Sequence, residues 1–150
     1  MVEDAAQGMN ATYKDQYLGA IGDIGAFSFH ETKNYICGEG GAIAINNMKF
    51  AERTEIIREK GTNRSKFFRG EVDKYTWVDI WSSYLPSDLL SAFLYAQLEN
   101  MDAIDKRRRK IFDYHLQSLE SLKDSGYLQL PVIPSTCNPC GHLFFYHSQG

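Results

Sequence analysis

The sequence contains little cysteine, no long apolar run and no excess of positive charge. Its three cysteines leave at least one thiol unpaired in a monomer, and their number does not indicate an oxidising compartment. The longest apolar runs, 42–45 and 143–146, fall far short of the roughly 20 residues that a membrane-spanning helix needs. A net charge of -3 provides no positive field for a polyanion. Membranes and nucleic acids are therefore poor candidates for partners.

The first residues carry neither the basic region nor the apolar region of a secretory signal. With 43% hydrophobic and 23% charged residues, the chain has the composition of an ordinary globular domain and not of a disordered one. We therefore expect a cytoplasmic protein with a hydrophobic core.

Secondary-structure signals in the first half of the chain predict α/β organisation. Residues 25–30 and 41–46 have the alternating or compact apolar patterns of buried strands. Asn47 is a suitable N-cap for a helix that ends near Gly61, so a helix follows a strand. Residues 61–86 have no clear periodicity, and we expect a loop that carries a group of aromatic side chains.

A long helix is predicted to begin after Ser87, which can cap it. Apolar residues recur at helical spacing from Leu90 to Leu122, and the pattern ends before Gly126. Because this length exceeds that of a typical globular helix, we expect it to bend or to connect two structural units. The basic run Arg107–Lys110 could be an anion-binding patch, but such a run usually lies on the solvated side of a helix.

Two further predicted strands, 127–131 and 142–146, suggest that a second unit follows the helix. We therefore divide the chain into a first domain (1–86), a linking helix (87–125) and the start of a second domain (126–150). Little strand precedes the acidic residues at the beginning, and the last strand has no helix to cover it. The sequence is thus expected to be a fragment, truncated at both ends.

Lys33 has the surroundings of a cofactor-binding lysine. It follows the first predicted strand and precedes the glycine-rich run 38–41, with Ser28 on the strand and Asp4 near the start of the chain. An amine for a Schiff base, a carboxylate for a pyridinium nitrogen, a hydroxyl for a phosphate and glycines for close backbone approach are what a pyridoxal phosphate (PLP) site needs. Each also has a simpler explanation: a surface lysine, a helix cap at Asp4, a local hydroxyl contact and a hairpin bend.

Three segments resemble the DegT/StrS family of sugar-nucleotide aminotransferases. They are Glu3-Asp4-Ala5-Ala6-Gln7, Phe27-Ser28-Phe29-His30-Glu31-Thr32-Lys33-Asn34 and Gly38-Glu39-Gly40-Gly41-Ala42. The resemblance spans nearly the whole chain. It implies the α/β fold of aspartate aminotransferase, the type I fold of PLP-dependent transferases, of which this chain would be a part truncated at both ends.

The resemblance also implies a role for each matched residue. Lys33 would form the Schiff base with PLP and carry the proton during transamination, and Asp4 would keep the pyridine nitrogen protonated. Ser28 would bind the cofactor phosphate, and Gln7 would contact its ring. Ser83 stands where family members have an asparagine that reaches the phosphate in the partner subunit, which implies a homodimer.

Two more segments resemble one branch of the family, namely Arg58-Glu59-Lys60-Gly61-Thr62-Asn63-Arg64-Ser65 and Asp73-Lys74-Tyr75-Thr76-Trp77. That branch aminates dTDP-4-dehydro-6-deoxyglucose to dTDP-4-amino-4,6-dideoxygalactose, a sugar donor for enterobacterial common antigen. Glutamate is the implied amino donor, and two half-reactions would give ping-pong kinetics. Family members that dehydrate sugars have histidine in place of Lys33, so the lysine favours transamination.

Two other interpretations remain open at this point. The ligand types of Cys137, Cys140, His142 and His147 suit a zinc-binding module. All four lie within eleven residues, however, and a predicted strand separates the last two, so a loop that leads into a strand is favoured and no metal is expected. Alternatively, these 150 residues are a non-catalytic structural module that is inactive when isolated.

Overall fold

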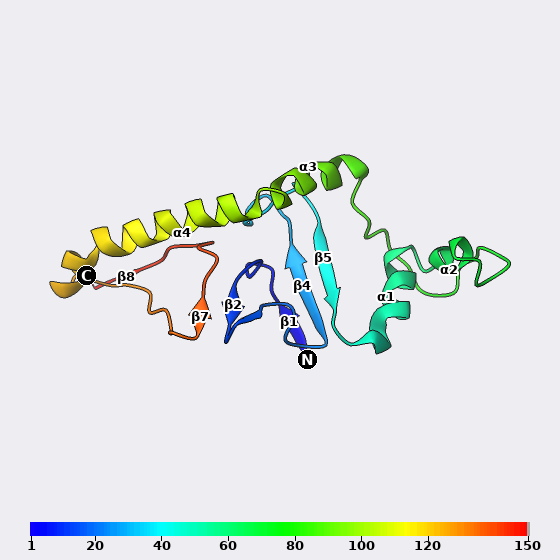
Figure 1. Cartoon of the computed structure of the whole chain (residues 1–150), viewed down its shortest axis with the longest axis horizontal. Coiled ribbons are helices and arrows are strands. Elements are labelled where there is room, and N and C mark those ends of the chain that lie inside the picture. The colour runs from blue at the N-terminus through cyan, green and yellow to red at the C-terminus, as the bar shows by residue number, and fades with distance from the viewer. Residues whose placement is uncertain (150) are drawn as a thin grey trace.

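The computed structural model describes residues 1–149 and is elongated, with three small sheets and a line of helices along one side (Figure 1). The first strands lie near its middle, next to the strand β4. The α1–α2 region occupies one end and the C-terminal segment the other. The α/β class predicted from the sequence is confirmed, because a parallel strand pair and several helices are present.

The central sheet has the strand order β1-β4-β5. Its strands are Val2–Asp4, Ile24–Ser28 and Gly41–Ile45. β1 is parallel to β4, with Asp4 opposite Ala26, and β5 is antiparallel to β4, with Gly41 opposite Ser28. The carboxyl ends of parallel strands meet at one edge of a sheet, where α/β proteins bind their ligands. Asp4 therefore lies at the same edge as the loop that follows Ser28 and contains Lys33.

Strands β4 and β5 confirm the two strands predicted from apolar patterns, within two residues at each end. The burial expected for β5 is wrong for its first half. Its first three residues are exposed, and the side chain of Ile43 retains 49% of its accessible surface. β5 is an edge strand that pairs only with β4 within residues 1–149, so an apolar pattern typical of a covered strand lies here at an open edge.

A second sheet joins the beginning of the chain to its end. Its order is β3-β2-β7, with strands Gln16–Tyr17, Thr12–Tyr13 and Cys137–Asn138. Lys14 and Asp15 form the tight turn between β2 and β3 with φ values of 49° and 62°, as a two-residue hairpin of the type I′ class requires. The pairing of Thr12 with Asn138 places the C-terminal segment beside the turn that follows β1.

The predicted helix after Asn47 is confirmed. The side chain of Asn47 accepts from the N–H of Lys49 at 3.1 Å and caps a 3-10 turn, Met48–Phe50, which leads into α1, Ala51–Arg58. The helix stops before Gly61, whose φ of +66° suits glycine. A second helix, α2, spans Arg64–Phe68, so the expectation of a loop throughout residues 61–86 is wrong there. A five-residue helix is too short to give a periodic pattern.

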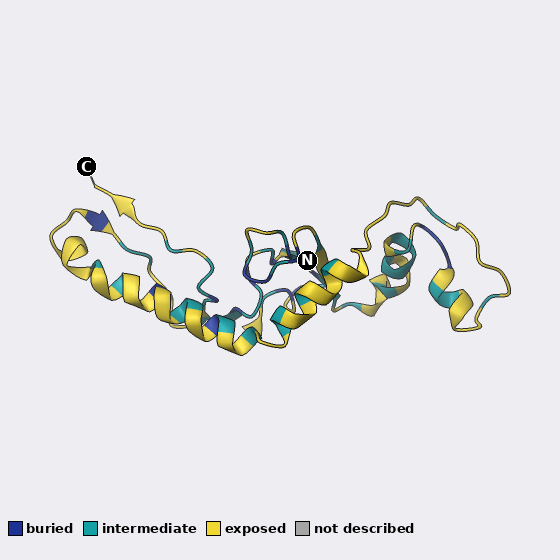
Figure 2. Ribbon diagram, turned by 90° about the horizontal axis from the view of Figure 1, so that it is seen from above, coloured by how far each residue is buried: buried dark blue, intermediate teal, exposed yellow. Residues whose placement is uncertain are grey.

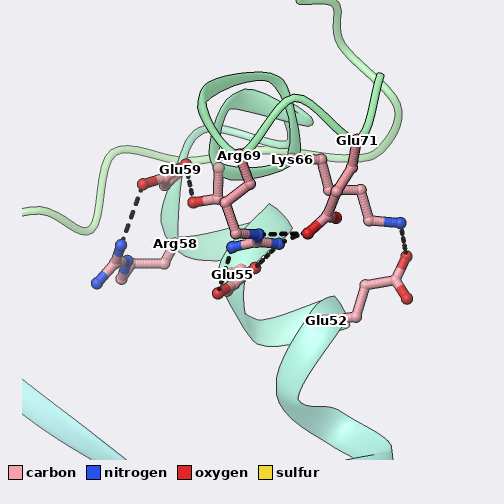
Figure 3. Close-up of polar contacts among 8 residues, drawn as sticks. Glu52, Glu55, Arg58, Glu59, Lys66, Arg69 and Glu71 are labelled. Carbon is pink, nitrogen blue, oxygen red and sulfur yellow. Dashed lines mark hydrogen bonds and ion pairs between the residues drawn. The ribbon is translucent and has the colours of Figure 1, made fainter.

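Ion pairs connect α1 with α2 and the residues after it (Figure 3). The guanidinium of Arg69 donates to both oxygens of Glu55 at 3.2 Å and to Glu71 at 2.7 Å. Lys66 donates to Glu52 at 2.5 Å. Because these side chains are largely solvated, each pair adds little to stability. The residue before α2, Asn63, is buried, and its side chain bonds to the backbone of Lys74 and Thr76 at 3.0 Å and 2.8 Å.

The single helix predicted after Ser87 consists of three helices, α3 (Asp88–Leu98), α4 (Met101–Ser118) and α5 (Glu120–Asp124). Ser87 caps α3 as expected, since its Oγ accepts from the N–H of Leu90 at 3.4 Å. Interruptions at Glu99–Asn100 and Leu119 produce the bend that the length of the pattern predicted. In Figure 1 these helices run along most of the length of the molecule.

The predicted strand 127–131 is present as β6, Leu128–Gln129, but the predicted strand 142–146 is wrong. Residues 141–146 have no regular structure, and β6 pairs instead with the short strand β8, His147–Ser148. The solvated-face interpretation of the basic run is also wrong in part. Arg107 and Lys110 are exposed, whereas Arg109 is half-buried and its Nη1 donates to Oδ1 of Asn138 at 2.5 Å.

The main buried cluster lies where the Lys33 loop meets the helices. Phe29, Tyr35 and Cys37 are almost fully buried, and partly buried side chains of the helices pack against them, namely Leu90, Leu94, Leu98, Met101 and Ile104. Figure 2 shows that exposed residues predominate along the rest of the helices. The core therefore holds the Lys33 loop against α3 and α4. No helix among the described residues is long and apolar enough to cross a membrane.

Gly61 and Gly70 allow a test of how α1 connects to the segment that follows α2. Both have a positive φ, at +66° and +74°, so alanine at either position is expected to cost about 1–2 kcal/mol in backbone strain. At Gly61 a Cβ would also lie 2.3 Å from the backbone oxygen of Asp79, whereas at Gly70 it would meet nothing within 4 Å. We expect Gly61→Ala to lower the free energy of unfolding clearly more than Gly70→Ala, as measured by denaturant titration. Equal losses would contradict the described packing.

Candidate functional site

Asp4 ends β1, and its backbone continues into a turn. Its Oδ1 accepts from the N–H of Ala6 at 3.1 Å, and no helix follows within residues 5–12. The interpretation of Asp4 as a helix cap is therefore wrong, although the local hydrogen bond that it supposed is present. The second carboxylate oxygen is available at the edge of the sheet. Gln7, three residues later, is exposed in the same turn.

Lys33 lies in a tight loop between β4 and β5. The N–H groups of Phe29 and Cys37 donate to Gly40 and Phe29 at 2.8 Å, and Glu31 donates to Gly38 at 3.1 Å, which extends the hairpin beyond the sheet. The N–H of Lys33 donates to the carbonyl of His30 at 2.9 Å. These backbone hydrogen bonds position Lys33, which is half-buried, in an ordered turn at the carboxyl end of β4.

Ser28 is the last residue of β4 and is half-buried. Its Oγ accepts from the N–H of His30 at 3.3 Å, as the simpler interpretation of this hydroxyl supposed. The hydroxyl proton is still free to donate, since a serine hydroxyl both donates and accepts. Ser28 and Lys33 thus belong to one segment, and Asp4 and Gln7 belong to the neighbouring one.

A cavity of about 570 Å³ opens between the turn after β1 and the C-terminal segment. Asp4 and Gln7 line one side, and Cys140 and His142 line the other. The thiol of Cys140 donates to the carbonyl of Gln7 at 3.2 Å and joins the two sides. Lys33 and Ser28 are not among the residues that line this cavity. The structure therefore brings the acid and the amide to one cavity, while the hydroxyl and the amine lie at the end of β4 and in the loop that follows it.

His142 connects this cavity to the Lys33 loop. Its Nδ1 lies 2.5 Å from Oδ1 of Asn34, the buried residue next to Lys33. Burial, followed by the positive charges of Arg108 and Lys33, lowers the pKa of His142 below its usual value of 6.5. The imidazole is therefore neutral at pH 7. The Nδ2 atom of Asn34 is buried and has no hydrogen-bond partner within residues 1–149.

Ser83 lies apart from these residues in the single chain. It is exposed and forms a backbone bridge with Glu59, directly after α1, in the end of the molecule that contains α1 and α2 (Figure 1). The cavity has no lining residue from that segment. One chain does not bring Ser83 to the site, so its expected role depends on a second subunit.

The four candidate zinc ligands are not gathered. Cys137 lies in β7, Cys140 bonds to Gln7, His142 bonds to Asn34 and His147 lies in β8. No group of three or more histidine, cysteine or acidic side chains that could hold a metal ion occurs in the described part of the chain. The zinc-binding interpretation is therefore not supported.

Several residues of the site surroundings escaped the sequence patterns. Asn34, Tyr35 and Asp105 are polar and buried, and Gln97 bonds to the backbone of Ile36. Their partners are 61 to 108 residues away along the chain. Only the immediate proximity of Asn34 and Tyr35 to Lys33 could have drawn attention to them.

The residues present fit PLP. An acidic side chain at the end of one strand, an amine in the loop after its parallel neighbour and a hydroxyl at the end of that neighbour match the nitrogen, aldehyde and phosphate groups of the cofactor. In the glycine-rich return, an added Cβ at Gly38 would meet nothing within 4 Å, whereas one at Gly41 would lie 2.7 Å from the backbone oxygen of Phe27, so the close approach of the chain to β4 requires glycine there.

Comparison with known proteins gives the family. A model of the DegT/DnrJ/EryC1/StrS aminotransferase family matches residues 1–146. An uncharacterised protein of Methanocaldococcus jannaschii is 31% identical over 147 residues, which cover 96% of this chain and 37% of that protein. The dTDP-3-amino-3,4,6-trideoxy-alpha-D-glucose transaminase of Streptomyces venezuelae is 31% identical over 145 residues, covering 96% of this chain and 35% of the transaminase.

Solved structures give the fold. The DesV protein of S. venezuelae in complex with a ketimine intermediate has a TM-score of 0.81 and 30% identity, over 99% of this chain and 37% of DesV. A provisionally assigned sugar aminotransferase of Streptococcus pneumoniae in its PLP form has a TM-score of 0.82 and 22% identity, over 99% of this chain and 37% of its own. The expected fold, a part of the aspartate aminotransferase fold, is confirmed. The chain spans about a third of the length of the relatives it matches.

The titration of His142 tests the electrostatics of the cavity. An unfolded chain binds a proton at this histidine near pH 6.5, whereas the folded chain resists it, so this residue makes the fold less stable as the pH falls below about 6.5. We expect Arg108→Gln to raise the pKa of His142, measured by NMR titration of the imidazole, because one repelling charge is lost. The exposed neighbour Arg107→Gln is the matched control, and an equal shift in both variants would contradict the geometry.

Proposed function

The chain belongs to the DegT/DnrJ/EryC1/StrS aminotransferase family, and we propose that the protein transfers an amino group to a nucleotide-linked keto sugar with PLP as cofactor. The observation that carries the proposal is the placement of Asp4 and the Lys33 loop at the carboxyl ends of two adjacent parallel strands. A PLP-form relative and a transaminase of a dTDP-linked sugar support the choice of cofactor and substrate class.

When bound, PLP supplies an electron sink that stabilises negative charge on the carbon attached to the transferred nitrogen. Lys33 is the residue proposed to hold the cofactor covalently through Nζ and, once released, to move a proton to or from that carbon. Asp4 would keep a proton on the pyridine nitrogen through its second carboxylate oxygen. Its other oxygen remains fixed by the N–H of Ala6, so the carboxylate is oriented before the cofactor arrives.

Ser28 and Gln7 are proposed to orient the cofactor at its two other polar positions. The Ser28 hydroxyl would donate to the phosphate while its oxygen continues to accept from the N–H of His30. Gln7 would contact the ring, or its hydroxyl, from the cavity wall that it shares with Asp4. The carbonyl of Gln7 is held by Cys140, which leaves its side-chain amide for the cofactor.

We propose that the protein acts as a homodimer in which Ser83 reaches the cofactor phosphate of the partner subunit. Ser83 is exposed and remote from the cavity of its own chain. Around it Trp77, Trp81 and Tyr84 retain 60 to 68% of their accessible surfaces. An exposed group of large aromatic side chains is typical of an interface between proteins. The 150 residues alone are accordingly expected to be inactive.

The finer substrate assignment rests on sequence resemblance alone. Residues 58–65 and 73–77 favour dTDP-4-dehydro-6-deoxyglucose as acceptor and dTDP-4-amino-4,6-dideoxygalactose as product, with glutamate as donor. This would place the enzyme, in the cytoplasm, in the synthesis of enterobacterial common antigen. We further propose that residues 1–86 belong to the cofactor-binding domain, 87–125 to a linking helix and 126–150 to the smaller domain.

Covalent attachment at Lys33 is the direct test of the proposed function. In the protein as its gene encodes it, borohydride reduction of the PLP complex is expected to label Lys33, as identified by peptide mapping. Lys33→Ala should lower kcat by about a thousandfold or more, since both the covalent attachment and the proton transfer are lost. Lys14→Ala, in the exposed hairpin, is the control and should match the wild type. Labelling at another lysine would refute the assignment.

Asp4→Asn tests the acid that faces the ring nitrogen. Asparagine retains an oxygen that can accept from Ala6, so the turn is expected to fold normally. The loss of the negative charge should lower kcat by about 100-fold to 1000-fold, by analogy with the removal of one electrostatic contact in other active sites. Asp15→Asn is the matched control, because its hairpin position has a positive φ that asparagine tolerates. Unchanged kinetics in Asp4→Asn would exclude this role.

A further inference from the structure

Asp105, in α4, is a buried carboxylate that lies between two distant parts of the chain. It retains 4% of its accessible surface. The hydroxyl of Tyr35 donates to its Oδ1 at 2.5 Å, and Nδ2 of Asn10 donates to its Oδ2. We call these three residues the Asp105 cluster. A buried carboxylate is costly unless hydrogen bonds satisfy it, and here each oxygen has a donor of its own.

The two residues that donate to Asp105 lie close in sequence to the proposed site residues, one in each of the two segments. Tyr35 follows Lys33 by two residues, and Asn10 follows Gln7 by three. The two segments are also joined by the short β1–β4 pairing, by Met9, which packs against the buried cluster that contains Tyr35, and by contacts of the C-terminal segment. Asp105 is therefore one group in direct contact with both the segment that carries the amine and the segment that carries the acid.

We propose that Asp105 is a positioning residue that sets the location of Lys33 relative to Asp4. It does so by holding Tyr35 on one carboxylate oxygen and Asn10 on the other. This inference rests on the proposed function, since it assigns a purpose to the distance between Lys33 and Asp4. Displacements of about 1 Å between reacting groups can change rates by as much as 100-fold, so a fixed spacing has a kinetic consequence.

The chemistry of the cluster gives each contact a defined direction. Tyr35 is 1% exposed, and burial, followed by the hydrogen bond and the negative charge of Asp105, raises its pKa above the usual value. Tyr35 therefore stays protonated and donates at any physiological pH. An ionised carboxylate only accepts, and the amide nitrogen of Asn10 only donates. The cluster cannot reverse its hydrogen bonds without losing one of them.

Two other side chains, Gln97 and His142, hold the same loop, and their hydrogen bonds go to that loop and not to the turn after β1. The Gln97 side chain accepts from the N–H of Ile36 at 3.2 Å and donates to its carbonyl at 2.5 Å. His142 contacts Asn34. Each of the three residues after Lys33 is thus held by a side chain from the second half of the chain. Among those three side chains, only Asp105 also bonds to a residue of the turn region after β1.

The test uses a pair of isosteric substitutions in the protein as its gene encodes it, loaded with PLP. Asp105→Asn keeps the shape but removes the negative charge and places an amide nitrogen opposite Asn10, whose own amide must then turn over to accept from it. In the double variant Asn10→Asp with Asp105→Asn, the amide nitrogen at position 105 donates to the carboxylate at position 10. The hydrogen bond and the negative charge are thus restored, with donor and acceptor exchanged. Asp102→Asn, at an exposed position one turn earlier in α4, is the matched control for the removal of an acidic charge.

We expect Asp105→Asn to lower kcat by about tenfold while KM for the keto sugar changes less than about twofold, because the spacing of the reacting groups is altered and not the sugar contacts. The pH midpoint of the visible band of the Lys33-bound cofactor should shift by about half a unit or more, since the surroundings of the amine change. The double variant should recover both values to within about threefold and a few tenths of a unit. The Asp102→Asn variant should match the wild type.

Each result decides the proposal. A lower Tm in Asp105→Asn with unchanged kcat and band midpoint would show a purely structural role and overturn it, as would a double variant that recovers stability alone. If Asp105→Asn does not fold, the double variant by itself decides, because it is expected to fold with nearly normal kcat and band midpoint. Failure of borohydride to label Lys33 in the wild type would refute the proposed function instead, so the two failures are distinguishable.

Discussion

The parallel pairing of β1 with β4 is the constraint on which the rest of the site depends. It places Asp4 opposite Ala26 and sends both chains out of the sheet at one edge. The antiparallel return of β5 then closes the Lys33 loop into a hairpin, with Gly41 opposite Ser28. Backbone hydrogen bonds of the sheet thus define where the acid, the hydroxyl and the amine can lie before any of their side chains makes a contact.

The helices after residue 87 turn this arrangement at the sheet edge into an ordered site. Their apolar side chains pack on Phe29, Tyr35 and Cys37, so the Lys33 loop is part of the main core and not a surface excursion. Polar contacts then fix individual residues of the loop, with Asp105 satisfied on both oxygens. The C-terminal segment closes the cavity from the other side through β7 and Cys140. Residues from both ends of the chain therefore build one site.

Strand β5 and the segment that follows α2 expose apolar side chains. β5 presents an open edge, and the segment around Trp77 and Trp81 exposes large aromatic side chains. The relatives are longer than this chain, which covers 35 to 37% of them. In the proposed homodimer, exposed apolar side chains such as these would lie at the interface, and Ser83 would reach the site of the partner subunit.

Local sequence determined much of the fold. The strand patterns at β4 and β5 and the helix caps at Asn47 and Ser87 act over a few residues, so they could be predicted from short-range chemistry. The roles of Lys33 and Asp4 were proposed from the resemblance of their segments to a family. The tertiary structure alone decided the breaks in the long helix, the helix α2, the irregular residues 141–146 and the Asp105 cluster. Those features arise from contacts between residues as many as 108 positions apart, and periodicity along the chain carries no record of such partners.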